Sequence, residues 1–256
     1  MNNIFDTHAH YDDEAFLEDR EEVLGLLTNK GVSHVITCGT DLMSSYRSLK
    51  LAQQYDFIYA ALGFHPEDIG EERKGDLDVI KDLLVSEPKA VAVGEIGLDY
   101  HYEDGAPKED QIDLFRRQIE LANELDLPVI VHDRDAHEDT FNIIKELRPR
   151  GVIHCFSGSK EMALEYVKLG MYIGVGGVVT FKNARKAVEV VEALPIEKIL
   201  LETDCPYMAP TPHRGERNDS SLISFVAEKV GEIKNLTPQE VCDITNQNAK
   251  TLFNIK

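Results

Sequence analysis

The chain has 256 residues, of which 46 are acidic and 27 basic, so its formal net charge at pH 7 is −19. A balance this acidic argues against broad electrostatic capture of DNA, although bound cations and a few local arginines can make a positive pocket on an acidic protein. The first residues carry no basic stretch followed by an apolar one, and no run of about 18 apolar residues occurs, so we expect a cytoplasmic protein with no membrane span.

Short apolar runs alternate along the chain with longer amphipathic segments. The short runs predict eight strands, at residues 4–6, 34–37, 57–62, 90–93, 129–131, 152–154, 171–175 and 199–202. The longer segments predict eight helices, at residues 17–29, 43–54, 77–86, 109–125, 136–147, 160–168, 184–193 and 222–233. A ninth helix is expected over 238–253, since Thr237 fits its N-cap, Pro238 its first position and Glu240 its capping box.

This alternation predicts the fold class. Strands that alternate with helices form parallel α/β structures, and a length near 250 residues is typical of the (β/α)8 TIM barrel. Two runs, 129–131 and 198–201, are almost continuously apolar, as strands buried on both faces are. No linker, repeat or low-complexity stretch interrupts the pattern, so we predict a single barrel domain over residues 1–256.

Residue types that bind metals follow five of the predicted strands at the same end. Two histidines, two positions apart, follow the first strand, and on an extended chain they point to the same side. Because the carboxyl ends of barrel strands converge on one rim, we expect all of these side chains to meet there. Burying them together would be costly without a cation, so we predict one or two divalent metals; histidine and carboxylate ligands suit Zn, Mn or Fe and admit Mg or Ni less readily. The predicted ligands are His8, His10, Glu95, His132, His154 and Asp204.

Seven segments, spread over nearly the whole chain, carry a family resemblance. They are FDTHAH (5–10), GFHP (63–66), GEIGLDY (94–100), VHDRDA (131–136), HCFSG (154–158), LETDCP (201–206) and RGERN (214–218). In this order they resemble the TatD family of metal-dependent deoxyribonucleases, within the wider amidohydrolase-like superfamily.

The resemblance implies a barrel that hydrolyses DNA phosphodiesters with one or two metals. The resemblance also implies that His8 and His10 bind one metal and that His132 and His154 bind a second. Glu95 would be able to bridge the two metals. Asp204 is implied as a ligand that also accepts a proton from the attacking water. Glu95 and Asp204 are therefore the predicted catalytic residues.

Four further residues are predicted to contact substrate. His65, which precedes Pro66, could contact a phosphate, or could be a loop histidine fixed by the proline turn. Arg134, close to the rim, could clamp a phosphate through two hydrogen bonds, or form a surface ion pair. Arg214 and Arg217 lie in the loop after the last strand and could hold the DNA backbone, or could be solvated loop charges.

The leading functional hypothesis is a deoxyribonuclease, with 3′–5′ exonuclease action implied by the family alone, DNA as substrate and no obligate protein partner evident. An alternative is the same metal site hydrolysing another ester, such as D-aminoacyl-tRNA, or a small-molecule amide or ester. Relatives in the superfamily that cleave C–N bonds often carry a carbamylated lysine where this chain has Glu95, which favours the phosphoesterase.

Asp133 and Glu216 depart from the family pattern and make the rim more acidic. A third hypothesis, a barrel that has lost its chemistry, is disfavoured by the complete ligand set.

Overall fold

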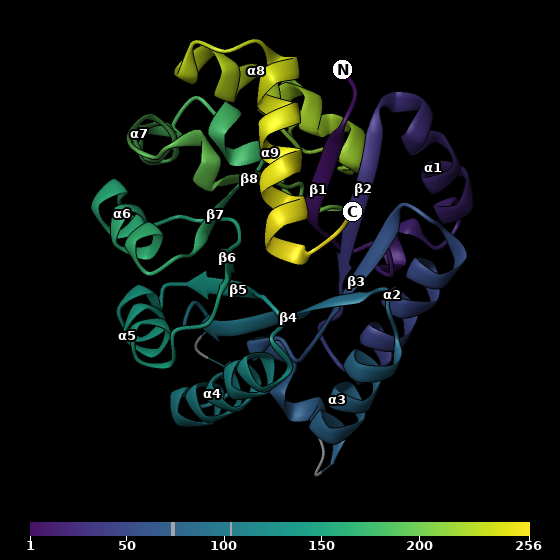
Figure 1. The fold of residues 1–256 in the computed structure, drawn as a ribbon, viewed down its shortest axis with the longest axis vertical. Helices are drawn as coiled ribbons and strands as arrows, with labels where there is room; N and C mark the ends of the chain where they lie inside the picture. The colour runs from purple at the N-terminus through teal and green to yellow at the C-terminus, as the bar shows by residue number, and fades with distance from the viewer. Residues whose placement is uncertain (73–74, 103) are drawn as a thin grey trace.

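The strands of the computed structural model form one parallel sheet that curls into a barrel (Figure 1). The structure describes residues 1–72, 75–102 and 104–256. Neighbouring strands pair in chain order and always in parallel, which confirms the predicted (β/α)8 fold class. The strands are β1 (Ile4–Ala9), β2 (Val32–Cys38), β3 (Ile58–Leu62), β4 (Ala90–Asp99), β5 (Val129–Arg134), β6 (Gly151–Ile153), β7 (Tyr172–Val175) and β8 (Ile199–Leu201).

The barrel closes where the segment after β8 meets the end of β1. The backbone N–H of Asp204 donates to the His8 carbonyl at 2.9 Å, and that of His10 donates to the Cys205 carbonyl at 2.8 Å. Three of the predicted metal ligands, His8, His10 and Asp204, take part in these two hydrogen bonds through their backbone atoms. The seam of the barrel therefore lies within the rim that carries them.

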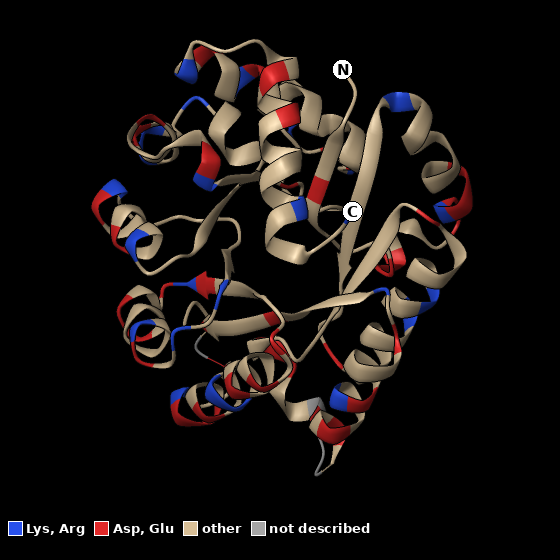
Figure 2. Ribbon diagram, in the orientation of Figure 1, with Lys and Arg blue, Asp and Glu red and all other residues tan. Residues whose placement is uncertain are grey.

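Helices surround the barrel and alternate with its strands (Figure 1). Charged residues of both signs lie mainly along these outer helices, whereas the strands are mostly uncharged (Figure 2). The acidic excess is thus carried largely by the solvated surface. The helices are α1 (Arg20–Leu27), α2 (Leu42–Gln54), α3 (Asp76–Ser86), α4 (Lys108–Leu125), α5 (His137–Leu147), α6 (Lys160–Lys168), α7 (Arg185–Ala193), α8 (Ile223–Lys234) and α9 (Pro238–Phe253).

The last helix, α9, covers the amino end of the barrel. Its Phe253 ring lies 6.4 Å from the ring of Phe5 at the start of β1. Leu252 and Ile255 join the cluster of apolar side chains from β1 to β6 and β8 that fills the barrel interior. Arg150, just before β6, donates to the Leu252 carbonyl at 2.9 Å. With this end filled, the carboxyl end is the one that remains for a site.

All predicted strands and helices are found, but some boundaries were wrong. The helix predicted over 17–29 is shorter, because 3-10 turns over Glu14–Phe16 and Thr28–Lys30 flank α1. The strand predicted to end at residue 93 continues to Asp99, so Glu95 lies within β4 and does not follow it. Gly97 allows this continuation: its φ is 150°, and a Cβ there would lie 2.0 Å from the carbonyl oxygen of His132.

The side chain of Asp6 joins the first strand of the barrel to the segment that follows the last strand. Its carboxylate is fully buried and accepts hydrogen bonds from the Thr203 N–H at 3.0 Å and the Thr203 hydroxyl at 2.6 Å. It also accepts from the Ser220 hydroxyl at 2.6 Å and the His8 N–H at 3.3 Å. One side chain thus joins β1 to the segment after β8 and to the start of the α8 region.

We expect Asp6→Ala to destabilise the protein by roughly 2 kcal/mol or more, because two buried backbone N–H groups would lose their acceptor. Urea unfolding measures this loss. The matched control is Asp243→Ala, which removes an exposed carboxylate of α9 that accepts from Asn3 at 2.8 Å, and it should change stability by less than about 0.5 kcal/mol. Equal midpoints for the two variants would contradict this role of Asp6.

Candidate metal centre

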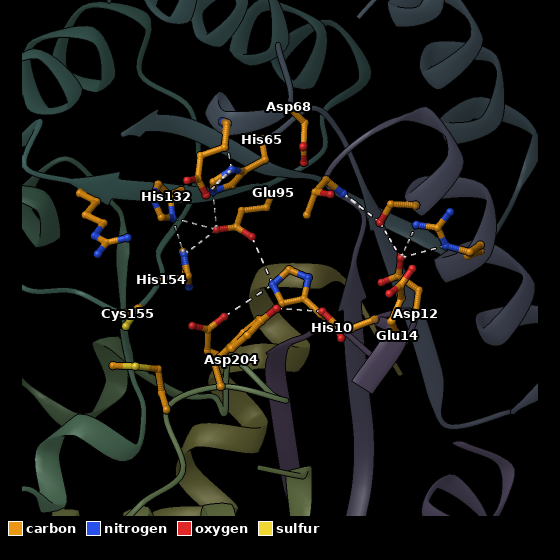
Figure 3. A pocket seen from close by; sticks show the side chains of 18 of the residues that line it. His10, Asp12, Glu14, His65, Asp68, Glu95, His132, His154, Cys155 and Asp204 are labelled. Atoms are coloured by element: carbon orange, nitrogen blue, oxygen red, sulfur yellow. Dashed lines mark hydrogen bonds and ion pairs between the residues drawn. The ribbon is translucent and has the colours of Figure 1, made fainter. Parts of the chain in front are cut away.

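The carboxylate of Glu95 lies at the centre of the predicted ligand cluster (Figure 3). One oxygen, Oε2, is 3.3 Å from Nε2 of both His8 and His10. The other, Oε1, is 2.7 Å from Nε2 of His154 and 3.0 Å from Nδ1 of His132. Each oxygen therefore faces its own pair of imidazoles.

The first ligand group consists of His8, His10, Asp204 and the Oε2 oxygen of Glu95. The two Nε2 atoms are 3.0 Å apart, and the Oδ1 oxygen of Asp204 is 3.5 Å from each. Ligands bonded to one tetrahedral ion at about 2.0–2.2 Å are themselves roughly 3.3–3.6 Å apart. The distances of 3.3 and 3.5 Å from the carboxylate oxygens to the two Nε2 atoms fall in this range, and the two Nε2 atoms are slightly closer to each other.

The second ligand group consists of His132, His154, His65 and the Oε1 oxygen of Glu95. Nδ1 of His132 is 3.3 Å from Nε2 of His154. Nε2 of His65 is 3.6 Å from the same Glu95 oxygen, and its ring lies 4.4 Å from that of His132. Burial lowers the pKa of His65 to about 3, so its ring is neutral and can donate a lone pair. The structure therefore places His65 beside the predicted ligands rather than at the outer rim, in a group with Glu95 and His132 that could hold a metal ion, and its contact with a phosphate stays a prediction.

The remote ring nitrogens have partners that orient the ligands. Nδ1 of His10 lies 3.1 Å from the Cys38 carbonyl, and Nε2 of His132 lies 3.0 Å from the Asp99 carboxylate. Each partner can accept a hydrogen bond from a ring N–H, which leaves the other nitrogen of a neutral ring available to a cation. Two imidazole nitrogens that face each other at 3.0 Å, as in the first group, also need a proton or a cation between them. The donor set fits divalent metal ions.

The cluster combines anionic carboxylates with imidazoles of different protonation. Burial works against a charge on His132, but hydrogen bonds to Asp99 and Glu95 raise its pKa to about 10, so a cation that binds this ring displaces a proton. Burial alone would raise the pKa of Glu95, but the imidazoles of His154 and His8 hold it well below its usual range. Burial also opposes ionisation of Asp204, yet its contact with His10 and the nearby His8 lower its pKa. Burial lowers the pKa of His8 to about 4, so this ring is neutral at pH 7. The groups present two carboxylates and a neutral imidazole to a cation.

The cluster opens into a cavity of about 1090 Å³ at the carboxyl end of the barrel. Arg134 lines this cavity, and its side chain is 44% exposed. Its guanidinium donates to the Tyr102 hydroxyl at 3.1 Å and lies 4.0 Å from Asp99. It is therefore placed to meet an anion that approaches the metal ligands.

The other two predicted arginines are placed differently, and neither is among the residues that line the cavity. Arg217 forms two hydrogen bonds to the Asp19 carboxylate, at 2.8 and 2.6 Å. The Arg214 guanidinium lies 4.4 Å from the centre of the Phe181 ring. Their contact with a substrate stays a prediction.

Glu202 is a residue of the site that the sequence analysis did not single out. It is buried next to His154, and its Oε1 accepts a hydrogen bond from the N–H of Cys155. Burial raises the pKa of Glu202 to about 8. Gly174 leaves room for it, since a Cβ there would lie 2.3 Å from its Oε2. The signal was present in the spacing, because Glu202 precedes Asp204 by two positions, as His8 precedes His10.

Together, a closed parallel barrel and a buried histidine–carboxylate cluster at its carboxyl rim define the class of metal-dependent barrel hydrolases. A family model described as "TatD related DNase" matches residues 5–254, and the chain belongs to this family. A Bacillus subtilis protein called "Uncharacterized metal-dependent hydrolase YabD" is 46% identical, with 98% of this chain and 99% of the relative covered.

Two further relatives extend the comparison. A Salmonella typhimurium protein named "3'-5' ssDNA/RNA exonuclease TatD" is 32% identical over 98% of this chain and 99% of its own length. The crystal structure of the TatD homologue YjjV from Escherichia coli superposes with a TM-score of 0.93, at 36% identity and with 99% of each chain covered.

Among the described residues, no helix is both long and apolar enough to cross a membrane.

We expect Asp99→Asn to weaken metal binding by roughly 10- to 100-fold, because His132 would lose the charged partner that orients it. Isothermal titration of metal-free protein with Zn²⁺ or Mn²⁺ measures the affinity. The control is Asp135→Asn, which removes an exposed carboxylate 2.8 Å from His101, outside the ligand groups. Unchanged affinity in Asp99→Asn would rule out this role.

Proposed function

We propose that the protein is a deoxyribonuclease that hydrolyses phosphodiester bonds at the 3′ ends of DNA. The observation that carries the proposal is the division of Glu95 between two ligand groups that open into one cavity beside Arg134. Paired metal sites bridged by one ligand are common in enzymes that cleave phosphodiesters. The family description and the name of the Salmonella relative point to the same chemistry.

The first ligand group would hold one divalent ion and the second group another, and Zn, Mn, Mg, Ni and Fe are the candidates. When bound, such ions lower the pKa of water to roughly 7 and offset the negative charge of the phosphate. Glu95 sets the separation between the groups. Arg134 offers a further positive charge to a non-bridging oxygen of the phosphate.

Asp204 is the proposed general base. Its side chain is 21% exposed, whereas that of Glu95 is 4% exposed and that of His8 is fully buried. Its lowered pKa keeps it ionised at neutral pH, so it can take a proton from the attacking water. The water oxygen then bonds to phosphorus, one P–O ester bond breaks, and the departing oxygen receives a proton from solvent.

One feature favours a second candidate, a D-aminoacyl-tRNA ester. Carboxylates of Asp12, Asp13, Glu14 and Glu67 line the cavity, and such a rim suits the ammonium group of an aminoacyl end. The same attack on a carbonyl carbon would cleave this ester. Both substrates are therefore assayed together.

Asp204→Asn is expected to keep its fold and to lose at least about 100-fold in kcat on single-stranded DNA, because the proton acceptor is removed. Turnover of end-labelled DNA with added Mn²⁺, Mg²⁺ or Zn²⁺ measures this, alongside metal content and circular dichroism. D-aminoacyl-tRNA serves as the second substrate. Clean wild-type protein with bound metal that leaves DNA intact would end the nuclease proposal, and cleavage of the ester alone would establish the alternative.

Arg134→Gln is expected to raise the KM for DNA about tenfold, with a smaller change in kcat, because a phosphate contact is lost. Arg217→Gln is the matched control: the same change is made at an arginine already paired with Asp19 and outside the cavity lining. A larger rise in KM for Arg217→Gln than for Arg134→Gln would contradict the role of Arg134 and indicate that the substrate contacts the loop after β8.

A further inference from the structure

Exposed apolar side chains gather at the mouth of the cavity. Ten large hydrophobic residues are exposed in the part of the chain that the structure describes, and four of them line this cavity. Single exposed apolar residues are ordinary, but a group around a catalytic opening indicates a binding surface. These four residues, the mouth group, are Leu17, Tyr102, Tyr207 and Met208.

Tyr207 is held in a fixed position although it is 55% exposed. Its N–H donates to the carbonyl of Asp204 at 2.9 Å, and its hydroxyl donates to the Asp13 carboxylate at 2.9 Å. The buried amide of Asn218 donates to the carbonyl of Tyr207 at 2.7 Å. The ring is thus tied at both ends and placed three residues beyond the proposed general base, so little side-chain freedom is lost when a ligand covers it.

Tyr102 is the second ring of the mouth group and is 47% exposed. Its hydroxyl accepts from Arg134, whose guanidinium lies 5.1 Å from the centre of the ring. The ring therefore stands beside the cation that the proposed function assigns to the phosphate. A base next to that phosphate would come within reach of an aromatic face.

The charges around the cavity do not suit a long polyanion. Asp12 and Glu14 lie across the pocket from His132 (Figure 3). The two arginines on that side are engaged with protein groups: Arg47 lies 3.2 Å from the Asp12 carboxylate, and Arg20 donates to the Asp12 carbonyl at 3.1 Å. The described residues that line the cavity therefore offer no row of free cations that could follow a phosphate backbone. A nucleobase is neutral and stacks on aromatic rings whatever its identity.

We propose that Tyr207 and Tyr102 stack against unpaired bases at the end of a single strand, with Leu17 and Met208 extending the apolar surface. This inference rests on the proposed nuclease function and specifies how its substrate is selected. Bases inside a duplex are covered on both faces by their neighbours, so an unpaired end offers more base surface to these rings than a duplex does. Substrate binding then depends on the terminal bases more than on strand length or salt.

The test measures KM on short single-stranded oligonucleotides with a normal or an abasic 3′ end, together with binding of an oligonucleotide that carries 2-aminopurine at that end. Stacking quenches the fluorescence of 2-aminopurine without any turnover. Tyr207→Leu and Tyr102→Leu remove the rings and keep apolar bulk. Tyr207→Phe keeps the ring, and Tyr46→Leu is the matched control, an exposed tyrosine of α2 that does not line the cavity.

For wild type, the abasic end is expected to raise KM at least about fivefold, and 2-aminopurine fluorescence is quenched on binding. Tyr207→Leu should raise KM by a similar factor on the normal end, show no further rise on the abasic end, and lose most of the quenching. Tyr102→Leu should act in the same direction. Tyr207→Phe keeps the ring but loses its bond to Asp13, so it should keep most of the quenching and raise KM less than Tyr207→Leu does. Tyr46→Leu should resemble wild type.

The outcomes separate this inference from the proposed function. DNA cleavage with a KM that is unaffected by both leucine variants and by the abasic end overturns base stacking and leaves the nuclease intact. Quenching that depends on Tyr207 in a protein that does not cleave DNA overturns the nuclease and supports base stacking. Neither cleavage nor quenching overturns both.

Discussion

The site depends on one buried carboxylate that is shared between two groups of imidazoles. Glu95 lies within β4 at a register irregularity between Val93 and Ile96, where its N–H donates to the carbonyl of Gly39 at 2.9 Å, and each of its oxygens meets different nitrogens. A buried carboxylate among neutral groups would be costly, whereas among imidazoles and cations it is stabilised. The spacing of the whole cluster follows from the position of this one side chain.

The barrel supplies the remaining order. Parallel strands bring residues from distant parts of the sequence to one rim, and α9 fills the opposite end. Hydrogen bonds that the Asp99 carboxylate and the Cys38 carbonyl accept from His132 and His10 then orient these rings. Three features therefore position the site: the closed sheet, the place of each residue along its strand, and the hydrogen-bond partner of each imidazole.

Much of this arrangement could be predicted from the sequence, for physical reasons. The apolar runs mark the strands, and a histidine or carboxylate directly after a run marks the rim, so the six side chains that the structure brings together were predicted as one group. The extension of β4 could not be read in this way, because Gly94 and Glu95 interrupt the apolar run and the pairing with β5 determines where the strand ends. The position of His65 beside the predicted ligands was not foreseen, because a histidine directly before a proline turn resembles an ordinary loop residue, and its contact with a phosphate stays a prediction.

The mouth of the cavity was the least predictable part. The direction in which an arginine side chain points depends on the carboxylate that it meets. Arg217 is paired with Asp19, and this pairing could not be predicted because the two residues lie far apart in the sequence. Tyr102 and Tyr207 carry no pattern that separates them from other surface tyrosines. Such residues are revealed only by their common position around an opening.

The location of the barrel seam has a consequence for the order in which the protein matures. The second ligand group comes from β3 to β6 and the residues next to them, which are consecutive in the chain, so it can assemble before synthesis is complete. The first group joins His8, near the first residue made, to Asp204, beyond the last strand, and it exists only once the ring of strands has closed. A nascent or truncated chain that lacks the segment after β8 would therefore lack the proposed general base, so the activity that we propose requires the closed ring of strands.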